Sequence, residues 1–103
     1  MSEADRRGSP RYSVGLPVQV KTGAETCSGQ LTSISRLGAL VQTERAFPVG
    51  ATLHLIVDLP SGALEVHGHG VRIDTSGDVH FHGILFAPLA ETALAQLDSL
   101  MPR

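Results

Sequence analysis

The chain has 103 residues, which suits one domain with one hydrophobic core. Eight Lys and Arg against ten Asp and Glu give a net charge of −2, which argues against binding to a long nucleic acid. The apolar runs are shorter than the roughly 20 residues of a membrane span, residues 1–5 lack the apolar run of a secretory signal, and Cys27 has no second cysteine to pair with. We therefore expect a cytoplasmic protein.

Residues 1–15 carry Ser, Gly, Pro and charge without an apolar period, which predicts a flexible N-terminal arm. Residues 16–103 are expected to form a single domain. Its strands are predicted, from alternating apolar residues and bounding turns, at residues 16–21, 26–34, 38–42, 52–59, 64–74 and 79–86. Residues 44–50 are predicted to be a loop whose two apolar residues pack onto the other elements.

Two strands have informative patterns. In residues 52–59 one face is apolar throughout, formed by Leu53, Leu55, Val57 and Leu59. In residues 64–74 the apolar parity changes between Val66 and Val71, which predicts a bulge near residues 68–70.

After Pro88, apolar residues recur at helical spacing, which predicts a C-terminal helix over residues 89–101. Six short strands with close turns, followed by one helix, predict an all-β fold. We expect a six-stranded antiparallel barrel that the helix caps.

Half of the basic residues lie in two short segments, and the first of these is in the arm. Residues 6–11 read RRGSPR and contain Arg6, Arg7 and Arg11, with Arg7 and Arg11 spaced R-x-x-x-R. Guanidinium groups bind phosphate oxygens or the O6/N7 edge of guanine in a bidentate way, and they stack on purine faces. The arm therefore predicts one half of a site for a small, doubly charged anion.

The second segment is TSISRLGAL, residues 32–40, in which Ser33, Ser35 and Gly38 form S-x-S-x-x-G. Ser33 and Ser35 are two residues apart at the end of a strand, so we expect both hydroxyls to face one pocket. Gly38 is expected to let the backbone turn sharply and approach a ligand without a Cβ atom. Arg36 lies inside this loop and is expected to reach a phosphate.

Together, the two motifs and the strand pattern resemble the PilZ domain family over nearly the whole chain. The family's fold, a six-stranded barrel with a C-terminal helix, is similar to the one predicted above. The resemblance implies a bacterial receptor or adaptor domain whose ligand is cyclic di-GMP. It implies that the arm and the S-x-S-x-x-G loop hold this ligand, and that binding changes a surface offered to an effector protein that the sequence does not identify.

The chain departs from the family at one position, because the family's second motif is [D/N]-x-S-x-x-G and Ser33 stands first here. A hydroxyl cannot accept two N–H groups as a carboxylate can. We therefore predict weaker binding than in relatives with the full motif. The same substitution favours an alternative, a PilZ protein-interaction module that does not bind cyclic di-GMP.

Other functions are less well supported. A barrel that binds single-stranded nucleic acid needs a basic groove lined by aromatic residues, whereas this chain has one Tyr, three Phe and a negative net charge. No G-x-S-x-G motif, P-loop or paired carboxylates suggest catalysis, so we do not expect an enzyme. The sequence leaves a monomer and a homodimer open.

Four histidines lie at residues 67–69 and 80–82, in HGH and HFH. If these strands pair, His69 is expected to lie diagonal to His82, a separation that a metal ion can bridge. No Asp, Glu or Cys obviously completes a ligand set. Solvent-facing histidines are therefore the favoured interpretation, and we expect neither a metal nor a cofactor.

Overall fold

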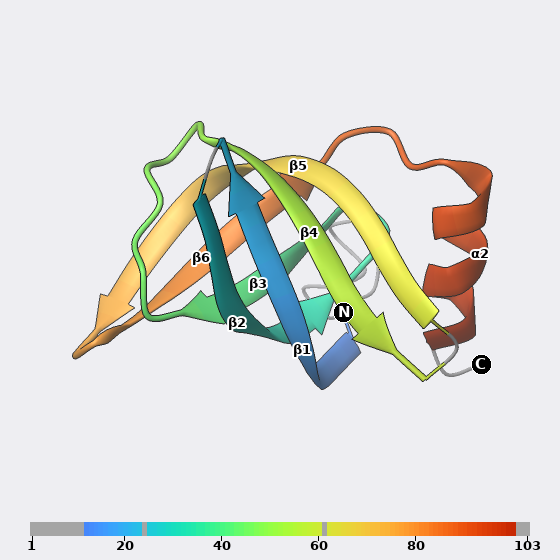
Figure 1. Cartoon of the computed structure of the whole chain (residues 1–103), viewed down its shortest axis with the longest axis horizontal. Helices are drawn as coiled ribbons and strands as arrows, with labels where there is room; N and C mark the ends of the chain where they lie inside the picture. The colour runs from blue at the N-terminus through green and yellow to red at the C-terminus, as the bar shows by residue number, and fades with distance from the viewer. Residues whose placement is uncertain (1–11, 24, 61, 101–103) are drawn as a thin grey trace, which may run out of the picture.

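The computed structural model describes residues 12–23, 25–60 and 62–100. Its elements in chain order are β1 (Tyr12–Thr22), β2 (Glu25–Ile34), β3 (Gly38–Thr43), β4 (Thr52–Leu59), β5 (Gly62–Ser76), β6 (Val79–Phe86) and α2 (Glu91–Leu100). All neighbouring strands are antiparallel, and they close into a barrel in the order β1-β2-β3-β6-β5-β4 (Figure 1). The predicted fold, an antiparallel six-stranded barrel with a C-terminal helix, is confirmed.

The inward faces of the strands form the core of the barrel. On β4 the predicted apolar face is confirmed, since Leu53, Leu55, Val57 and Leu59 are all buried. The side chains that are almost completely buried are Val20, Leu31, Ile34, Val41, Leu53, Leu55, Val57, Leu64 and Leu97. Because the core fills the barrel, ligands must bind on its outer surface or at its ends.

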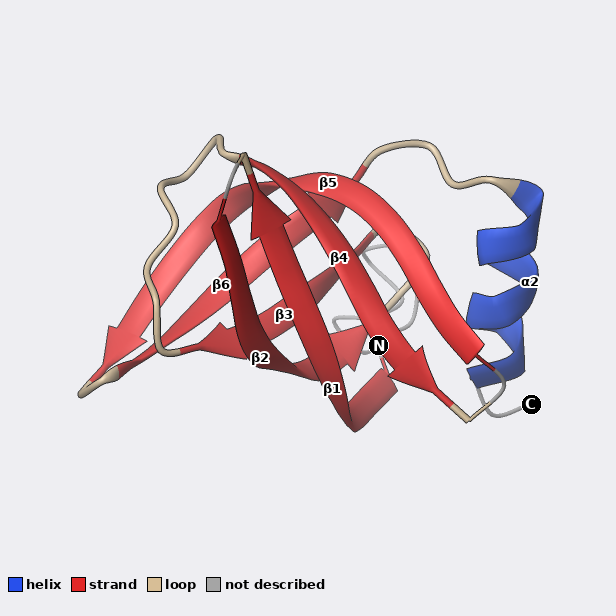
Figure 2. Ribbon diagram, viewed as in Figure 1, coloured by secondary structure: helices blue, strands red, loops and turns tan. Residues whose placement is uncertain are grey.

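Helix α2 stands at one end of the barrel, beside β5 (Figure 2). It buries Ala93 and Leu97, which are one helical turn apart and therefore share a face. Gln96 adds a hydrogen bond, because its Nε2 donates to the Ala63 carbonyl of β5 at 2.9 Å. Among the described residues, no helix has the length and apolar character that crossing a membrane requires.

The main difference from the expected boundaries is at β1, which begins at Tyr12 rather than at residue 16. Residues 12–15, expected to belong to the arm, continue the pairing with β2 across an irregularity between Ser13 and Leu16. Their pairing comes from backbone hydrogen bonds with β2, which an apolar period does not reveal. At the other end, α2 begins at Glu91, two residues after the predicted start.

The predicted bulge in β5 is present, between Gly70 and Arg72. Val71 is the extra residue and is 50% exposed, whereas Ile73 returns to partial burial opposite His82. One inserted residue reverses the alternation of side chains along a strand. The change of parity in the sequence was therefore correctly interpreted, although the bulge lies one residue beyond the predicted range and Val71 does not pack inward.

Candidate functional site

A bulge in β2 turns Ser33 towards the outer surface of the barrel. The register between β2 and β3 shifts between Leu31 and Ser33, so Thr32 is the extra residue. Leu31 faces the core, whereas Ser33 is half-buried and lies opposite Leu40. The Thr32 hydroxyl donates to the Leu40 carbonyl at 3.0 Å, which helps to hold the bulge. Without the extra residue, Ser33 would share the inward face of Leu31.

Ser35 is buried and its hydroxyl serves the loop that contains it, which we call the 33–38 loop (residues 33–38). Its Oγ accepts hydrogen bonds from the backbone N–H groups of Leu37 and Gly38, at 3.2 and 3.3 Å. The Ser35 backbone N–H donates to the Gly38 carbonyl at 2.8 Å. The expectation that Ser33 and Ser35 present their hydroxyls to one pocket is wrong, because the Ser35 hydroxyl is used to shape the turn.

Gly38 is required by packing between two strands. A Cβ atom at this position would lie 2.1 Å from the Ile84 carbonyl oxygen on β6. Gly38 is not among the described glycines with positive φ, so the expected sharp turn at this residue is wrong. The close neighbour that excludes a side chain is the β6 backbone.

Arg36 projects from the 33–38 loop towards α2. Its Nη2 lies 2.6 Å from Oδ1 of Asp98, and the two side chains are 57% and 45% exposed. An exposed pair of this kind contributes little to stability, roughly 0–1 kcal/mol. The Arg36 guanidinium can therefore exchange Asp98 for another anion at low cost.

The arm residues Arg6, Arg7 and Arg11 lie outside the described residues. The start of β1, which follows the arm in the sequence, is described and is paired with β2. Tyr12 is the Cα partner of Ile34, and Ser13 is the Cα partner of Ser33. The described chain thus enters the barrel beside the 33–38 loop. Arg11 directly precedes Tyr12 in the sequence.

The sequence did not indicate that His82 is buried inside the barrel. Its Nε2 lies 3.1 Å from both Thr43 Oγ1 and the Arg45 carbonyl oxygen, and Phe47 packs against its ring at a centroid distance of 5.4 Å. A carbonyl only accepts, so Nε2 carries the proton and donates to it. Burial lowers the pKa of His82 below its usual 6.5, opposed by the hydrogen bond with Arg45 and aided by nearby His80. His82 therefore fastens the loop after β3 to the barrel as a neutral side chain.

His54, His67 and His69 lie on the outer face of the barrel, whereas His80 is half-buried on the same face of β6 as His82, with ring centroids 6.5 Å apart. His69 and His82 are on opposite faces, so the expected diagonal pair is wrong. His54 and His67 stack across β4 and β5 with ring centroids 4.3 Å apart, and His54 Nε2 lies 3.0 Å from Glu65 Oε1. In the part of the chain that the structure describes, no three His, Cys, Asp or Glu side chains are placed to hold a metal ion.

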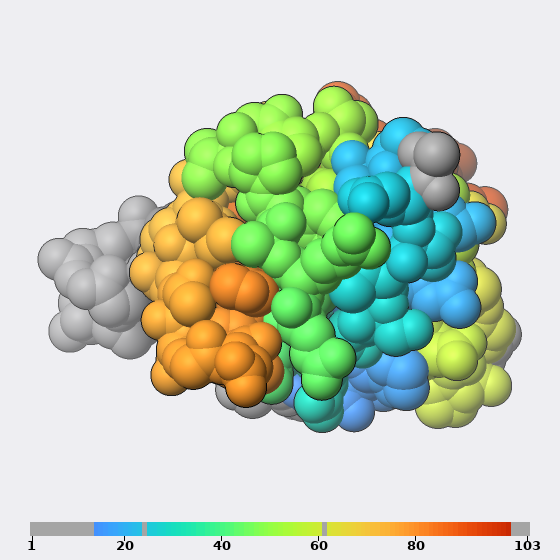
Figure 3. Space-filling model, turned by 60° about the vertical axis from the view of Figure 1, so that its left-hand side comes forward, coloured from blue at the N-terminus to red at the C-terminus, as the bar shows by residue number. Residues whose placement is uncertain are grey.

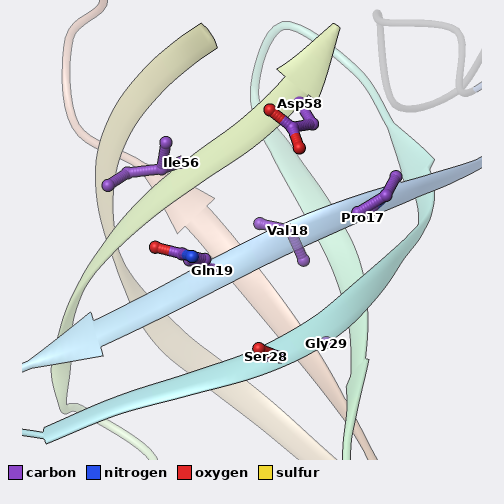
Figure 4. Close-up of a pocket in the computed structure, with 7 residues that line it drawn as sticks. All are labelled: Pro17, Val18, Gln19, Ser28, Gly29, Ile56 and Asp58. Atoms are coloured by element: carbon purple, nitrogen blue, oxygen red, sulfur yellow. The ribbon is translucent and has the colours of Figure 1, made fainter.

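Two hollows on the barrel have the wrong charge for a phosphate ligand. The first, of about 230 Å³, lies across β1, β2 and β4, and Figure 4 shows Gln19, Ser28 and the Asp58 carboxylate around it. The second, of about 420 Å³, is bounded by β2, β3 and the residues that follow β3. The charged lining residues are Asp58 in the first and Glu44 in the second. Neither hollow has an arginine or lysine in its lining, so neither suits a dianion.

Comparisons with solved structures support the fold. The PilZ domain of YcgR from Escherichia coli, solved with c-di-GMP, is similar with a TM-score of 0.76 and 18% identity, covering 92% of this chain and 88% of that one. The Bacillus subtilis inhibitor of motility MotI/DgrA matches with a TM-score of 0.75 and 22% identity over 91% of this chain, which spans only 49% of MotI. The PilZ domain of CeSA from a cellulose-synthesizing bacterium gives a TM-score of 0.66 and 15% identity, covering 88% and 93% of the two chains.

The search of curated proteins found no match. The family model described as "PilZ domain" matches residues 5–101, which include both motif segments, all six strands and the helix. The chain belongs to the PilZ domain family.

Proposed function

We propose that this chain is a bacterial receptor domain that binds cyclic di-GMP on the outer face of the barrel at the 33–38 loop, and that it is not an enzyme. The observation that carries the proposal is the register at the start of β1, where Tyr12 lies opposite Ile34 and Ser13 opposite Ser33. Arg11 precedes Tyr12 by one peptide bond, and Arg7 by four more residues. This topology supports an arm that can fold over the loop and bring both guanidinium groups to one ligand.

Membership of the PilZ family supports the choice of ligand, since the related YcgR domain was solved with c-di-GMP. The chemistry of the two segments is compatible with it. In the proposed complex, Arg7 and Arg11 donate to phosphate oxygens or guanine edges, with Arg6 beside them. Ser33 supplies a hydroxyl from the barrel, while Ser35 and Gly38 keep the loop in shape through their own contacts.

The test is an isothermal titration of the protein with cyclic di-GMP, with GTP as a ligand control. Arg11→Ala is expected to weaken binding by more than about tenfold, because a hydrogen bond to a charged group contributes about 1.5 to 3 kcal/mol. Arg45→Ala is the matched control, since Arg45 is an exposed arginine that pairs with Glu25 at 3.0 Å, away from the loop. If the unaltered protein gives no heat of binding, the proposal is overturned. If Arg11→Ala and Arg45→Ala lose affinity equally, the arm has no specific role in binding.

Ser33 determines the expected strength of binding. Ser33 faces outward beside the start of β1 and stands where the family's motif has Asp or Asn, so Ser33→Asp is expected to tighten binding by adding a second acceptor. An unchanged or weaker affinity in the same titration would contradict the role given to this position.

A second candidate is a PilZ module that does not bind the nucleotide and acts only through protein contacts. Two observations favour it, namely the missing carboxylate at Ser33 and the Arg36 guanidinium that already pairs with Asp98. In this case the titration gives no heat with either the unaltered protein or Ser33→Asp. In both cases we propose that the output passes to a separate effector protein.

A further inference from the structure

Four residues lie in one row across the outer face of four neighbouring strands. Ser33 of β2 is opposite Leu40 of β3, Leu40 is opposite Gly83 of β6, and Gly83 is opposite Arg72 of β5. Leu40 and Gly83 each lie between two buried neighbours, and Ser33 is followed by buried Ile34, so the row faces outward. Figure 3 shows these strands on one face of the molecule, from β2 in cyan through β3 in green to β6 and the end of β5 in orange.

The middle of the row is low and partly apolar. Gly83 has no side chain and Leu40 is half-buried, so the surface between Ser33 and Arg72 is a shallow floor with a polar residue at each end. Neighbouring strands are about 4.8 Å apart, which gives about 14 Å from Ser33 to Arg72 along the row. A ligand with two bases and two phosphates is long enough to contact both ends.

Arg72 leans over this floor. Its Nε and Cβ lie 3.9 and 3.5 Å from the point where a Cβ atom of Gly83 would be, so its side chain crosses towards β6. Nε also lies 3.1 Å from Oδ2 of Asp74, which orients the guanidinium. Within the described residues, Asp74 is the ion-pair partner recorded for Arg72, and it uses only Nε. The two Nη groups of the fork can therefore donate to a ligand, and the side chain is 60% exposed.

We propose that Arg72 is a further ligand-binding residue, which donates from the β5 side to a phosphate or a guanine edge of the nucleotide that the 33–38 loop holds. This inference rests on the function proposed above. It extends the proposed site from the arm and the 33–38 loop across the outer face of β2, β3, β6 and β5. It also gives the chain a guanidinium that is oriented before the ligand arrives, which reduces the ordering that binding requires.

The experiment is a set of titrations with cyclic di-GMP using the unaltered chain, Arg72→Gln, Arg72→Lys and Arg45→Gln. Arg45→Gln is the matched control, because both arginines are exposed and each pairs with one carboxylate. We expect Arg72→Gln to weaken binding by about threefold to tenfold. We expect Arg72→Lys to recover only part of this loss, since an ammonium lacks the bidentate fork. Arg45→Gln is expected to stay close to the unaltered chain, and coinciding urea midpoints show that the variants are equally folded.

The outcomes separate the two proposals. If the unaltered chain binds, Arg11→Ala loses binding and Arg72→Gln behaves like Arg45→Gln, the inference about Arg72 is overturned while the proposed function stands. If Arg72→Lys binds as tightly as the unaltered chain, charge alone acts and the bidentate contact is refuted. If the unaltered chain does not bind, both proposals are overturned.

Discussion

Replacing Gly38 with alanine tests whether a glycine is needed here so that β3 and β6 can pack closely in the barrel. The new Cβ atom would lie 2.1 Å from the Ile84 carbonyl oxygen and 3.2 Å from its carbon, where contacts under 3.0 Å essentially do not occur. The obstacle is backbone, so β3 and β6 must separate by about 1 Å. Overpacking of this kind costs about 1 to 3 kcal/mol, and a weakened ladder hydrogen bond adds about 1 kcal/mol. We expect Gly38→Ala to lose about 3 kcal/mol, a large share of the 5–15 kcal/mol typical of a domain.

The assay is urea denaturation monitored by circular dichroism, with Gly83→Ala as the control on the neighbouring strand. At Gly83 the nearest atoms to a new Cβ are at 3.5 and 3.9 Å, which is ordinary contact, so we expect a change within about 0.5 kcal/mol. If both variants unfold at the same urea concentration with equal slopes, the contact with Ile84 does not constrain Gly38. Loss of ligand binding in a Gly38→Ala protein of normal stability would instead point to a direct role in binding.

Three further predictions concern the loop, the buried histidine and the helix. Ser35→Ala removes the acceptor of two backbone N–H groups and is expected to cost about 1 to 3 kcal/mol in urea denaturation; no change would mean that water replaces the hydroxyl. Because burial lowers the pKa of folded His82, the unfolded chain takes up a proton first as the pH falls below 6.5, so stability is full above that pH and declines below it. Urea midpoints measured from pH 7.5 to pH 5 are expected to fall less steeply for His82→Gln, and equal slopes would contradict this assignment. Leu97→Ala is expected to cost about 2 to 5 kcal/mol through the cavity it leaves, whereas an effect under about 1 kcal/mol would mean that α2 is weakly docked.

The strands and the helix were predictable because their signal is local. The apolar alternation along a strand and the helical spacing after Pro88 can each be seen within one continuous segment, because each element buries one face. Of the two apolar residues in the loop at residues 44–50, Phe47 is buried as expected, but Val49 is 58% exposed, so the prediction for Val49 was wrong. Phe47 packs on His82, a contact between residues far apart in the sequence, while nothing in the loop's own pattern distinguishes the two side chains.

The site was harder to predict because the sequence pattern does not show which partner each polar side chain uses. Ser35 looked like a ligand-facing hydroxyl, but the local turn uses it, and Gly38 looked like a turn residue, but the β6 carbonyl excludes its side chain. Arg36 was expected to face a ligand, and the structure pairs it with Asp98, 62 residues later. The roles of Arg7 and Arg11 stay predictions, because both lie outside the described residues.

The bulge at Val71 has a consequence for how molecules meet in solution. In the described part of the chain, residues 72–76 of β5 pair with β6 alone, so this end of the strand has one side without a neighbouring strand. Such an edge is a template onto which a strand of another molecule can add, and this leads to aggregation. Here the bulge interrupts the regular spacing of backbone groups, and the ionic pair of Arg72 and Asp74 follows it directly. Both features disfavour the addition of a foreign strand, so the hairpin can extend from the barrel without offering a regular edge for another strand to pair with.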